Sequence, residues 1–279
     1  MNVDILHVEW TFGKEKEIHD IDLSKNYNKI ETPGRMLPYG PSVCVALQIW
    51  STFVRTLYKV KYCSQEIQVS DIDKYNKDVC QEFKSALVSS TSWLPKQTGI
   101  SLLLQCGMRK IFIANGELKE SFSDPTLDII LNEVVIIPRN VDIIGFINVN
   151  PYRYLYDLDS VLCGYGSMLC HALSNMRIRE DNHKVCIGKG LVYNLCVPSS
   201  RRVIIDTIYG RIPLDQSSLY LRTLIPLMLI LQEKLITNST IVFNVDTKVF
   251  GDNWYWLHDT LTEYTATNKC KLIIIDNVM

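Results

Sequence analysis

Short apolar runs and longer amphipathic segments follow one another along the chain. Apolar runs that are bounded by polar or turn-forming residues predict β-strands. The strands predicted in this way cover 3–10, 58–63, 100–106, 110–114, 127–137, 141–149, 201–209, 239–245 and 269–278. The runs 127–137 and 141–149 are apolar at most positions, which is typical of strands buried on both faces of a parallel sheet.

Helical periodicity appears between these runs. In 75–90, for example, Val79, Phe83 and Leu87 recur at the spacing of one helix face. The helices predicted are 43–58, 75–90, 161–176, 217–235 and 254–264, and 14–31 is expected to be a loop or a hairpin. Strands that alternate with helices indicate an α/β fold with a largely parallel sheet flanked by helices. No shift in composition marks a boundary, so we expect a single domain over 1–279.

Composition narrows the functional classes. The chain has 279 residues with 47% hydrophobic and 21% charged residues, as expected of a globular protein. Its net charge of -1 and the absence of a basic stretch give no reason to expect a nucleic-acid partner. The longest apolar run, Leu224 to Leu231, is too short to span a bilayer, so no membrane partner is expected either. The 9 cysteines contain no C-x-x-C pair and are expected to be reduced thiols of a cytoplasmic protein.

The segment GRMLPYGPSVCVALQIW, from Gly34 to Trp50, places a glycine-containing loop before a predicted helix. Its order approaches that of a phosphate-binding loop, G-x-x-x-x-G-K-[ST], followed by a helix. Pro41 stands where the loop requires lysine, and it lacks both the charge and a backbone N–H donor. Ser42 could still offer a hydroxyl to magnesium. The alternative is a helix that simply begins with proline in its first turn.

The segments that come after this loop also carry acidic and basic residues in or next to predicted strands and helices. The strand-like YCSQEIQV carries Glu66, and the helical DIDKYNKDVCQEF carries Asp73. They are followed by a segment with Arg109, by DIILNEVVII with Glu133, by INVNPYRYL, and by CVPSSRRVIIDTIYG with the helix that ends at Leu235. In this order the sequence resembles the uridine-cytidine kinases, which have a P-loop kinase fold, over 34–235. The segment 236–279 is then a C-terminal strand–helix–strand addition to that core.

The resemblance implies a nucleoside-kinase-like fold whose functional positions survive only in part. They would be Gly40 and Ser42 in the loop, Glu66 in place of the general base, Asp73 in the nucleoside-contacting segment, Arg109 on the substrate, and Glu133 at the acidic position of an apolar strand. The loop lysine is missing, and the segment after Leu155 lacks the arginines of the family's lid. Because positive charge does most of the work in phosphoryl transfer, we expect a non-catalytic protein without a cofactor.

An active nucleoside kinase with a rebuilt loop is the alternative. It would use Glu66 as base, Ser42 on magnesium and Arg109 on the substrate. It would also need another cation for the β- and γ-phosphates. His171, His183 and His258 are too dispersed along the chain to indicate a metal site.

The segment GDNWYWLHD, 251–259, places three aromatic residues side by side. We interpret it as turn-like, with one of two outcomes. Either a tryptophan packs into the core, or Trp254, Tyr255 and Trp256 form an exposed aromatic patch of the kind that anchors a protein interface. These three residues are the candidate protein-binding residues.

The chain is rich in Ile, Tyr, Asn and Cys, and its enzyme-like core is degraded. In this it resembles degenerate uridine-kinase-like accessory proteins of viruses, a class found in cetacean gammacoronaviruses. The segments 36–50 and 89–104 also resemble parts of phlebovirus nonstructural S proteins. The resemblance implies an antagonist of the integrated stress response in the host cytoplasm. Its partner would be the guanine-nucleotide exchange factor of translation initiation factor 2, and its oligomeric state stays open.

Overall fold

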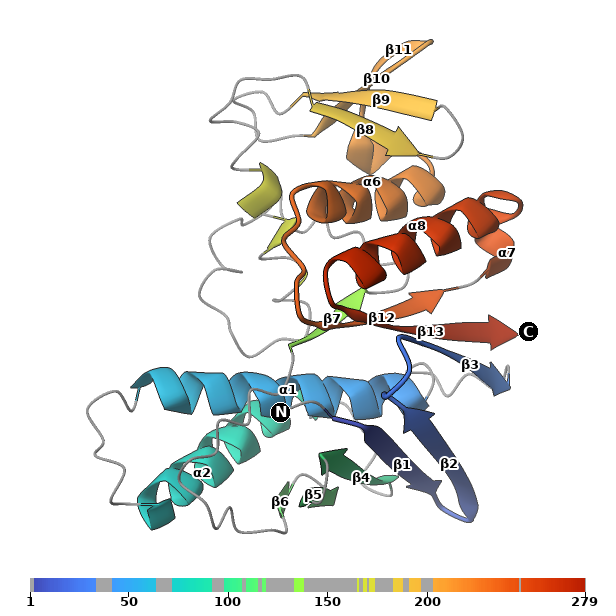
Figure 1. The fold of residues 1–279 in the computed structure, drawn as a ribbon. Coiled ribbons are helices and arrows are strands. Elements are labelled where there is room, and N and C mark those ends of the chain that lie inside the picture. Colours follow the sequence, from blue (N-terminus) through green and yellow to red (C-terminus); the bar gives the residue numbers. More distant parts are fainter. Residues whose placement is uncertain are drawn as a thin grey trace.

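Three sheets and the helices between them make up the described part of the protein (Figure 1). The structure is a computed structural model. It describes residues 3–33, 42–63, 72–91, 98–106, 109–114, 117–118, 133–137, 165, 168–169, 171–173, 183–187, 191–196, 203–245 and 247–278.

The first sheet is antiparallel and has five strands in the order β2-β1-β4-β5-β6. Its strands are β1 (Ile5–Phe12), β2 (Glu15–Asp22), β4 (Thr98–Cys106), β5 (Arg109–Ala114) and β6 (Glu117–Leu118). Gly13 joins β1 to β2 at a φ of 60°, a left-handed conformation that glycine adopts without steric cost. Residues that alternate along β1, such as Leu6, Val8 and Trp10, are buried on the side of the helices.

Helices α1 (Ser42–Cys63) and α2 (Ile72–Thr91) cover the inner face of this sheet. Buried residues recur along α1 at helical spacing, including Ile49, Trp50, Phe53 and Leu57, and the ring of Phe53 meets that of Phe83 edge-on at 5.3 Å. Helix α1 lies between the antiparallel sheet and the second sheet (Figure 1). One core therefore joins the first two sheets.

The second sheet is parallel, with strands in the order β3-β13-β12-β7. They are β3 (Tyr27–Pro33), β7 (Val134–Ile137), β12 (Thr240–Val245) and β13 (Lys271–Val278). Along β13, Ile273 and Ile275 face the core with α1, whereas Leu272 and Ile274 face a second core. Burial on both faces explains why this strand is apolar at successive positions.

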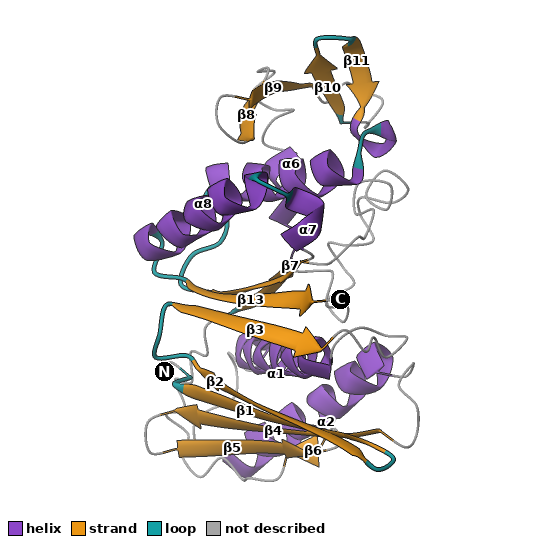
Figure 2. Ribbon diagram, turned by 90° about the vertical axis from the view of Figure 1, so that its right-hand side faces the viewer, coloured by secondary structure: helices purple, strands orange, loops and turns teal. Residues whose placement is uncertain are grey.

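The second core contains α6 (Leu219–Gln232) and α8 (Asn253–Thr267), which cover the other face of the parallel sheet (Figure 2). Every residue from Leu224 to Leu231 on α6 is buried. This is because α6 is enclosed between the parallel sheet and a third, antiparallel sheet. The short helix α7 (Thr247–Phe250) follows β12, and the 3₁₀ helix η1 (Leu214–Gln216) precedes α6.

The third sheet has four strands in the order β11-β10-β9-β8, with antiparallel pairs throughout. Its strands are β8 (His183–Ile187), β9 (Leu191–Cys196), β10 (Ile204–Thr207) and β11 (Gly210–Pro213). Val185, Ile187, Leu195 and Ile205 belong to the core with α6.

The prediction of a largely parallel sheet flanked by helices is wrong. The described strands form one parallel sheet and two antiparallel ones. Short apolar runs do not reveal the direction of their neighbours, and the turns decide it here. The tight β1–β2, β4–β5 and β10–β11 connections allow only antiparallel pairing, because a parallel pair needs a long crossover.

Two local predictions also need correction. The segment 58–63 was expected to be a strand because lysines alternate with apolar residues, but it forms the last turns of α1, where Val60 extends the buried face. The predicted strand 201–209 ends at Thr207, and its last two residues form a turn. The predicted strand 141–149 lies outside the described residues.

The segment 14–31, expected to be a loop or hairpin, contains β2, which forms a hairpin with β1, and the start of β3, which belongs to the parallel sheet. The predicted helix 161–176 and the start of the predicted strand 127–137 lie largely outside the described residues. Several other element predictions agree with the structure. Helices 43–58, 75–90 and 217–235 correspond to α1, α2 and α6, and the hairpin of 100–106 with 110–114 is β4–β5. The strands 239–245 and 269–278 of the expected C-terminal addition are β12 and β13, which form the middle of the parallel sheet.

Candidate functional site at the carboxyl edge of the parallel sheet

The four parallel strands end at a common edge, and this edge is where ligands bind in open parallel sheets. Strand β3 ends at Pro33, and α1 begins at Ser42; the glycine-containing segment between them lies outside the described residues. Strand β12 ends at Val245, and Thr247 begins α7 on the same side. Asp276 lies near the end of β13, in register with Val245 of β12 and Glu31 of β3.

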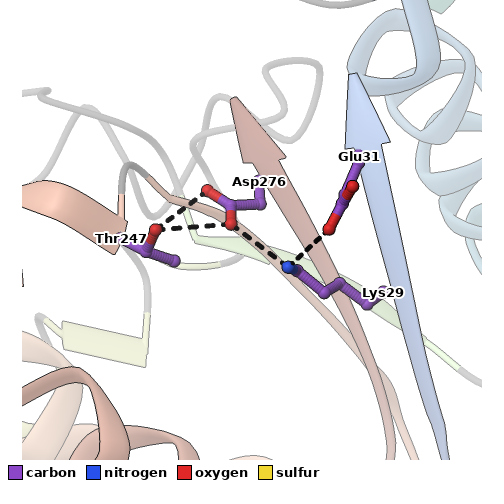
Figure 3. A network of polar contacts seen from close by, with 4 residues as sticks. All are labelled: Lys29, Glu31, Thr247 and Asp276. Carbon is purple, nitrogen blue, oxygen red and sulfur yellow. Dashed lines mark hydrogen bonds and ion pairs between the residues drawn. The ribbon is translucent and has the colours of Figure 1, made fainter. Parts of the chain in front are cut away.

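Four polar residues near this edge form a network (Figure 3). The Lys29 ammonium donates to Glu31 Oε1 at 2.8 Å and lies 3.5 Å from Asp276 Oδ2. On the other side of Asp276, the Thr247 hydroxyl lies 3.3 Å from both carboxylate oxygens. The network thus joins β3, β13 and α7 through the single carboxylate of Asp276.

Burial differs sharply within the network. The side chain of Asp276 is 8% exposed, whereas that of Glu31 is 64% exposed. A buried carboxylate needs a partner, and Lys29 together with Thr247 supplies it. The hydrogen bond to Glu31 raises the pKa of Lys29, and the same contact lowers the pKa of Glu31. Both groups are therefore held in their charged forms.

Chemically, the network holds one ammonium between two carboxylates. Its formal charge is negative, and its only cation is already neutralised by its neighbours. Such an arrangement repels a phosphate group, because phosphate binding relies on cations and N–H donors with unused charge. Among the described residues, there is no group of three or more His, Cys, Asp or Glu side chains able to hold a metal ion.

The residues predicted from the kinase resemblance are spread over the molecule. Gly40 and Glu66 lie outside the described residues. Ser42 is the first residue of α1 at the carboxyl edge, and Asp73 is the second residue of α2. Arg109 is the first residue of β5, which belongs to the antiparallel sheet.

Glu133 immediately precedes β7, at the opposite edge of the parallel sheet. Burial raises the pKa of its carboxyl, and nearby Arg55 of α1 acts in the opposite direction. At 1.5 Å per residue, Arg55 lies about 20 Å along α1 from Ser42. The structure therefore does not bring Glu133 together with Ser42.

The three adjacent aromatic residues form the first turn of α8, not a separate turn. Trp254 lies against Phe243 and Phe250, with ring centroids 6.4 and 6.2 Å away. Trp256 also packs against the second core, whereas Tyr255 is 74% exposed. Successive helical side chains point about 100° apart, so a contiguous patch of all three cannot form here.

Sequence reasoning did not single out Lys29, Glu31, Thr247 or Asp276. A signal was available for Asp276, since this aspartate follows the apolar run Leu272 to Ile275 at the end of a strand. Lys29 and Glu31 carried no such signal, because 14–31 was expected to be a loop or hairpin and only the structure pairs β3 with β13.

Comparisons with known proteins give little further guidance. No family model matches the chain, and no curated protein matches it. A solved structure described as the SmcHead bound to the C-winged helix domain of ScpA is similar at a TM-score of 0.43 and 11% identity. That match covers 100% of this chain and 90% of the other, and a similarity of this size carries no conclusion.

No helix in the described parts of the chain combines the length and the apolar character that a bilayer span requires.

Proposed function

We propose that the protein is a non-catalytic binding protein that acts on a host protein complex. The Lys29–Asp276 pair is the observation that supports this proposal most directly. A phosphotransferase would need a cation with unused charge at the carboxyl edge, to neutralise the phosphates in the transition state. Lys29, which lies near this edge, is instead held between Asp276 and Glu31.

The partner that we propose is the guanine-nucleotide exchange factor of translation initiation factor 2. The support comes from the sequence resemblance to viral accessory proteins with this target. Binding would occur in the host cytoplasm and would prevent the phosphorylated initiation factor from inhibiting the exchange factor. Catalysis has no part in this activity.

Two measurements on the purified full-length protein test the proposal. Pull-down with the purified exchange factor should give a stoichiometric complex. Thermal unfolding with millimolar ATP and Mg²⁺ should leave the melting temperature unchanged, because a ligand stabilises only a protein that binds it.

Failure to bind the exchange factor would refute the proposed partner. An ATP-dependent rise in melting temperature, together with phosphorylation of uridine that is lost in Glu66→Gln, would refute the non-catalytic role. That second result would restore the active nucleoside kinase as the explanation.

A further inference from the structure

The turn between β10 and β11 exposes two large apolar side chains. Ile208 is 91% exposed and Tyr209 is 89% exposed. The hairpin projects from the top of the molecule, and its turn points away from the helices (Figure 2). Single exposed apolar residues are ordinary, but an adjacent pair at a projecting tip marks a candidate contact with another molecule.

The turn is held in one conformation by its own hydrogen bonds. The Thr207 hydroxyl donates to the Gly210 carbonyl oxygen at 2.8 Å and accepts from the Tyr209 N–H at 3.1 Å. Gly210 has a φ of 116°, which a residue with a side chain rarely adopts. Beneath the turn, Arg211 Nε donates to Asp206 Oδ1 at 3.1 Å. The two apolar side chains are therefore presented on a preorganised support, which reduces the entropic cost of binding.

An exposed apolar residue also lies on the neighbouring strand. Asp206 of β10 pairs with Asn194 of β9, and Val192, two residues before Asn194 on β9, is 53% exposed. On the next strand, Val192 pairs with Cys186, whose side chain is also exposed.

One row of this outer sheet face, next to the row of Ile204 and Pro213, is polar. Arg211, Asp206, Asn194 and Lys184 lie directly across from one another on the four strands. Both signs of charge are present in this row. A flat apolar surface would meet these charges, and in this described row an anionic lipid surface would meet the carboxylate of Asp206 as well as the two basic side chains. A pocket that admits only the tip, with a polar rim that meets the row, fits both features.

We propose that the Ile208–Tyr209 turn is an anchor that inserts into an apolar pocket of a partner protein. This inference rests on the proposed function, in that it assumes a protein that acts by binding. It is independent of which partner is bound. Aromatic side chains that enter a desolvated pocket carry a large share of the affinity in many interfaces.

The test compares three forms of the full-length protein: wild type, the double variant Ile208→Ser with Tyr209→Ser, and the control Tyr255→Ser. Tyr255 is also exposed, but it lies on α8. Each replaced side chain is exposed, so thermal unfolding should match wild type. Affinity for the purified exchange factor should fall by about 100-fold in the double variant and by less than about threefold in the control.

Alkylation of cysteines in the complex gives a second readout. Cys186 lies on β8, two strands from β10 in the same sheet, and should react more slowly with iodoacetamide when a bound partner covers this face of the sheet. Cys80 on α2 is exposed as well and serves as the internal control, whereas Cys106 and Cys270 are buried.

The outcomes separate the two proposals. If wild type binds the exchange factor and the double variant binds equally well, the anchor is refuted and the proposed function stands. If wild type does not bind it, the proposed partner is refuted. Quantitative pull-down from cell lysate with the same three forms then tests whether the Ile208–Tyr209 turn is needed for binding to another protein.

In that case a partner must be identified, reconstituted from purified protein and shown to lose binding in the double variant. Capture of nothing by wild type, self-association that depends on the tip, or tip-dependent binding to phosphatidylserine vesicles would each overturn the anchor to a partner protein.

Discussion

The Lys29 ammonium lies 3.5 Å from the buried carboxylate of Asp276, although the two residues are 247 positions apart in the sequence (276 − 29). The pairing of β3 with β13 places them on neighbouring strands. Lys29 therefore links β3 to β13, which are the first and the last of the parallel strands along the chain. Its positive charge is balanced by carboxylates of the protein itself.

Replacement of Lys29 tests this link. Lys29→Met should lower the free energy of unfolding by about 1–2 kcal/mol, because Asp276 stays buried and loses its ammonium partner. The effect is small because the Lys29 side chain is 40% exposed and solvent screens part of the interaction. Urea unfolding at pH 7 measures the change. An unchanged midpoint would contradict a stabilising role for the Lys29–Asp276 pair.

Glu133 and Glu31 should respond to pH in opposite ways. Burial raises the pKa of Glu133 in the folded state, so its favourable contribution is present below its unfolded pKa and is lost as pH rises. Glu133→Gln should therefore stabilise the protein at pH 7 and have little effect at low pH. Urea unfolding at several pH values checks this, and a loss of stability at pH 7 would contradict it.

Glu31→Gln is the matched control. Lys29 lowers the pKa of Glu31, so its contribution is present above the unfolded pKa and is lost as pH falls through the folded value. The variant should be slightly less stable than wild type at pH 7 and equal to it in acid. If the two variants changed stability with pH in the same direction, the carboxyl groups of Glu133 and Glu31 would not have pKa values shifted in opposite directions.

Tyr264 of α8 donates its hydroxyl to the carbonyl oxygen of Ile236 at 2.7 Å. Tyr264→Phe should cost about 1 kcal/mol, since Ile236 is buried and loses an O–H donor. Burial raises the pKa of Tyr264 to about 12, so the neutral phenol favours folding. Its contribution should be present at pH 7 and lost as pH rises from about 10 through 12. Guanidinium unfolding of both forms at pH 7 and pH 11 measures the difference, with Tyr255→Phe as an exposed control.

Trp254 and Tyr255 are neighbours with different roles. Trp254→Ala should destabilise the protein by about 3 kcal/mol, because its ring fills space beside Phe243 and Phe250. Tyr255→Ala should change stability by less than about 0.5 kcal/mol, since the side chain is exposed. Chemical denaturation followed by far-ultraviolet circular dichroism compares the two. Equal losses would place both side chains in the core.

Much of the local structure could be predicted from the sequence. The periodicity of 43–58 and 75–90 gave α1 and α2, and the apolar runs gave β1, β4, β5, β12 and β13. These elements follow from side-chain spacing within a few neighbouring residues. The turn-like interpretation of 251–259 failed because α8 begins in that segment, and the adjacent tryptophans fit there on two sides of one helix.

The candidate site could not be predicted, since it depends on which strands are neighbours. Lys29 and Asp276 meet only because β3 joins the edge of a sheet whose other strands come from much later in the chain. Likewise, the sequence predicts Ile208 and Tyr209 as the end of the apolar strand 201–209. In the structure both residues lie in the turn between β10 and β11, where they are exposed.

The sequence by itself determined several of the helices and strands, among them α1, α2, α6, β12 and β13, and which of their faces are apolar, because these properties depend on local spacing. Only the tertiary structure decided that the described strands form one parallel and two antiparallel sheets. It also decided that the charge of Lys29 is balanced by Asp276 and Glu31 at the carboxyl edge, and that the apolar turn of Ile208 and Tyr209 projects into solvent. The physical reason is that strand pairing and solvent exposure are set by contacts between residues far apart in the chain, and no local pattern encodes them.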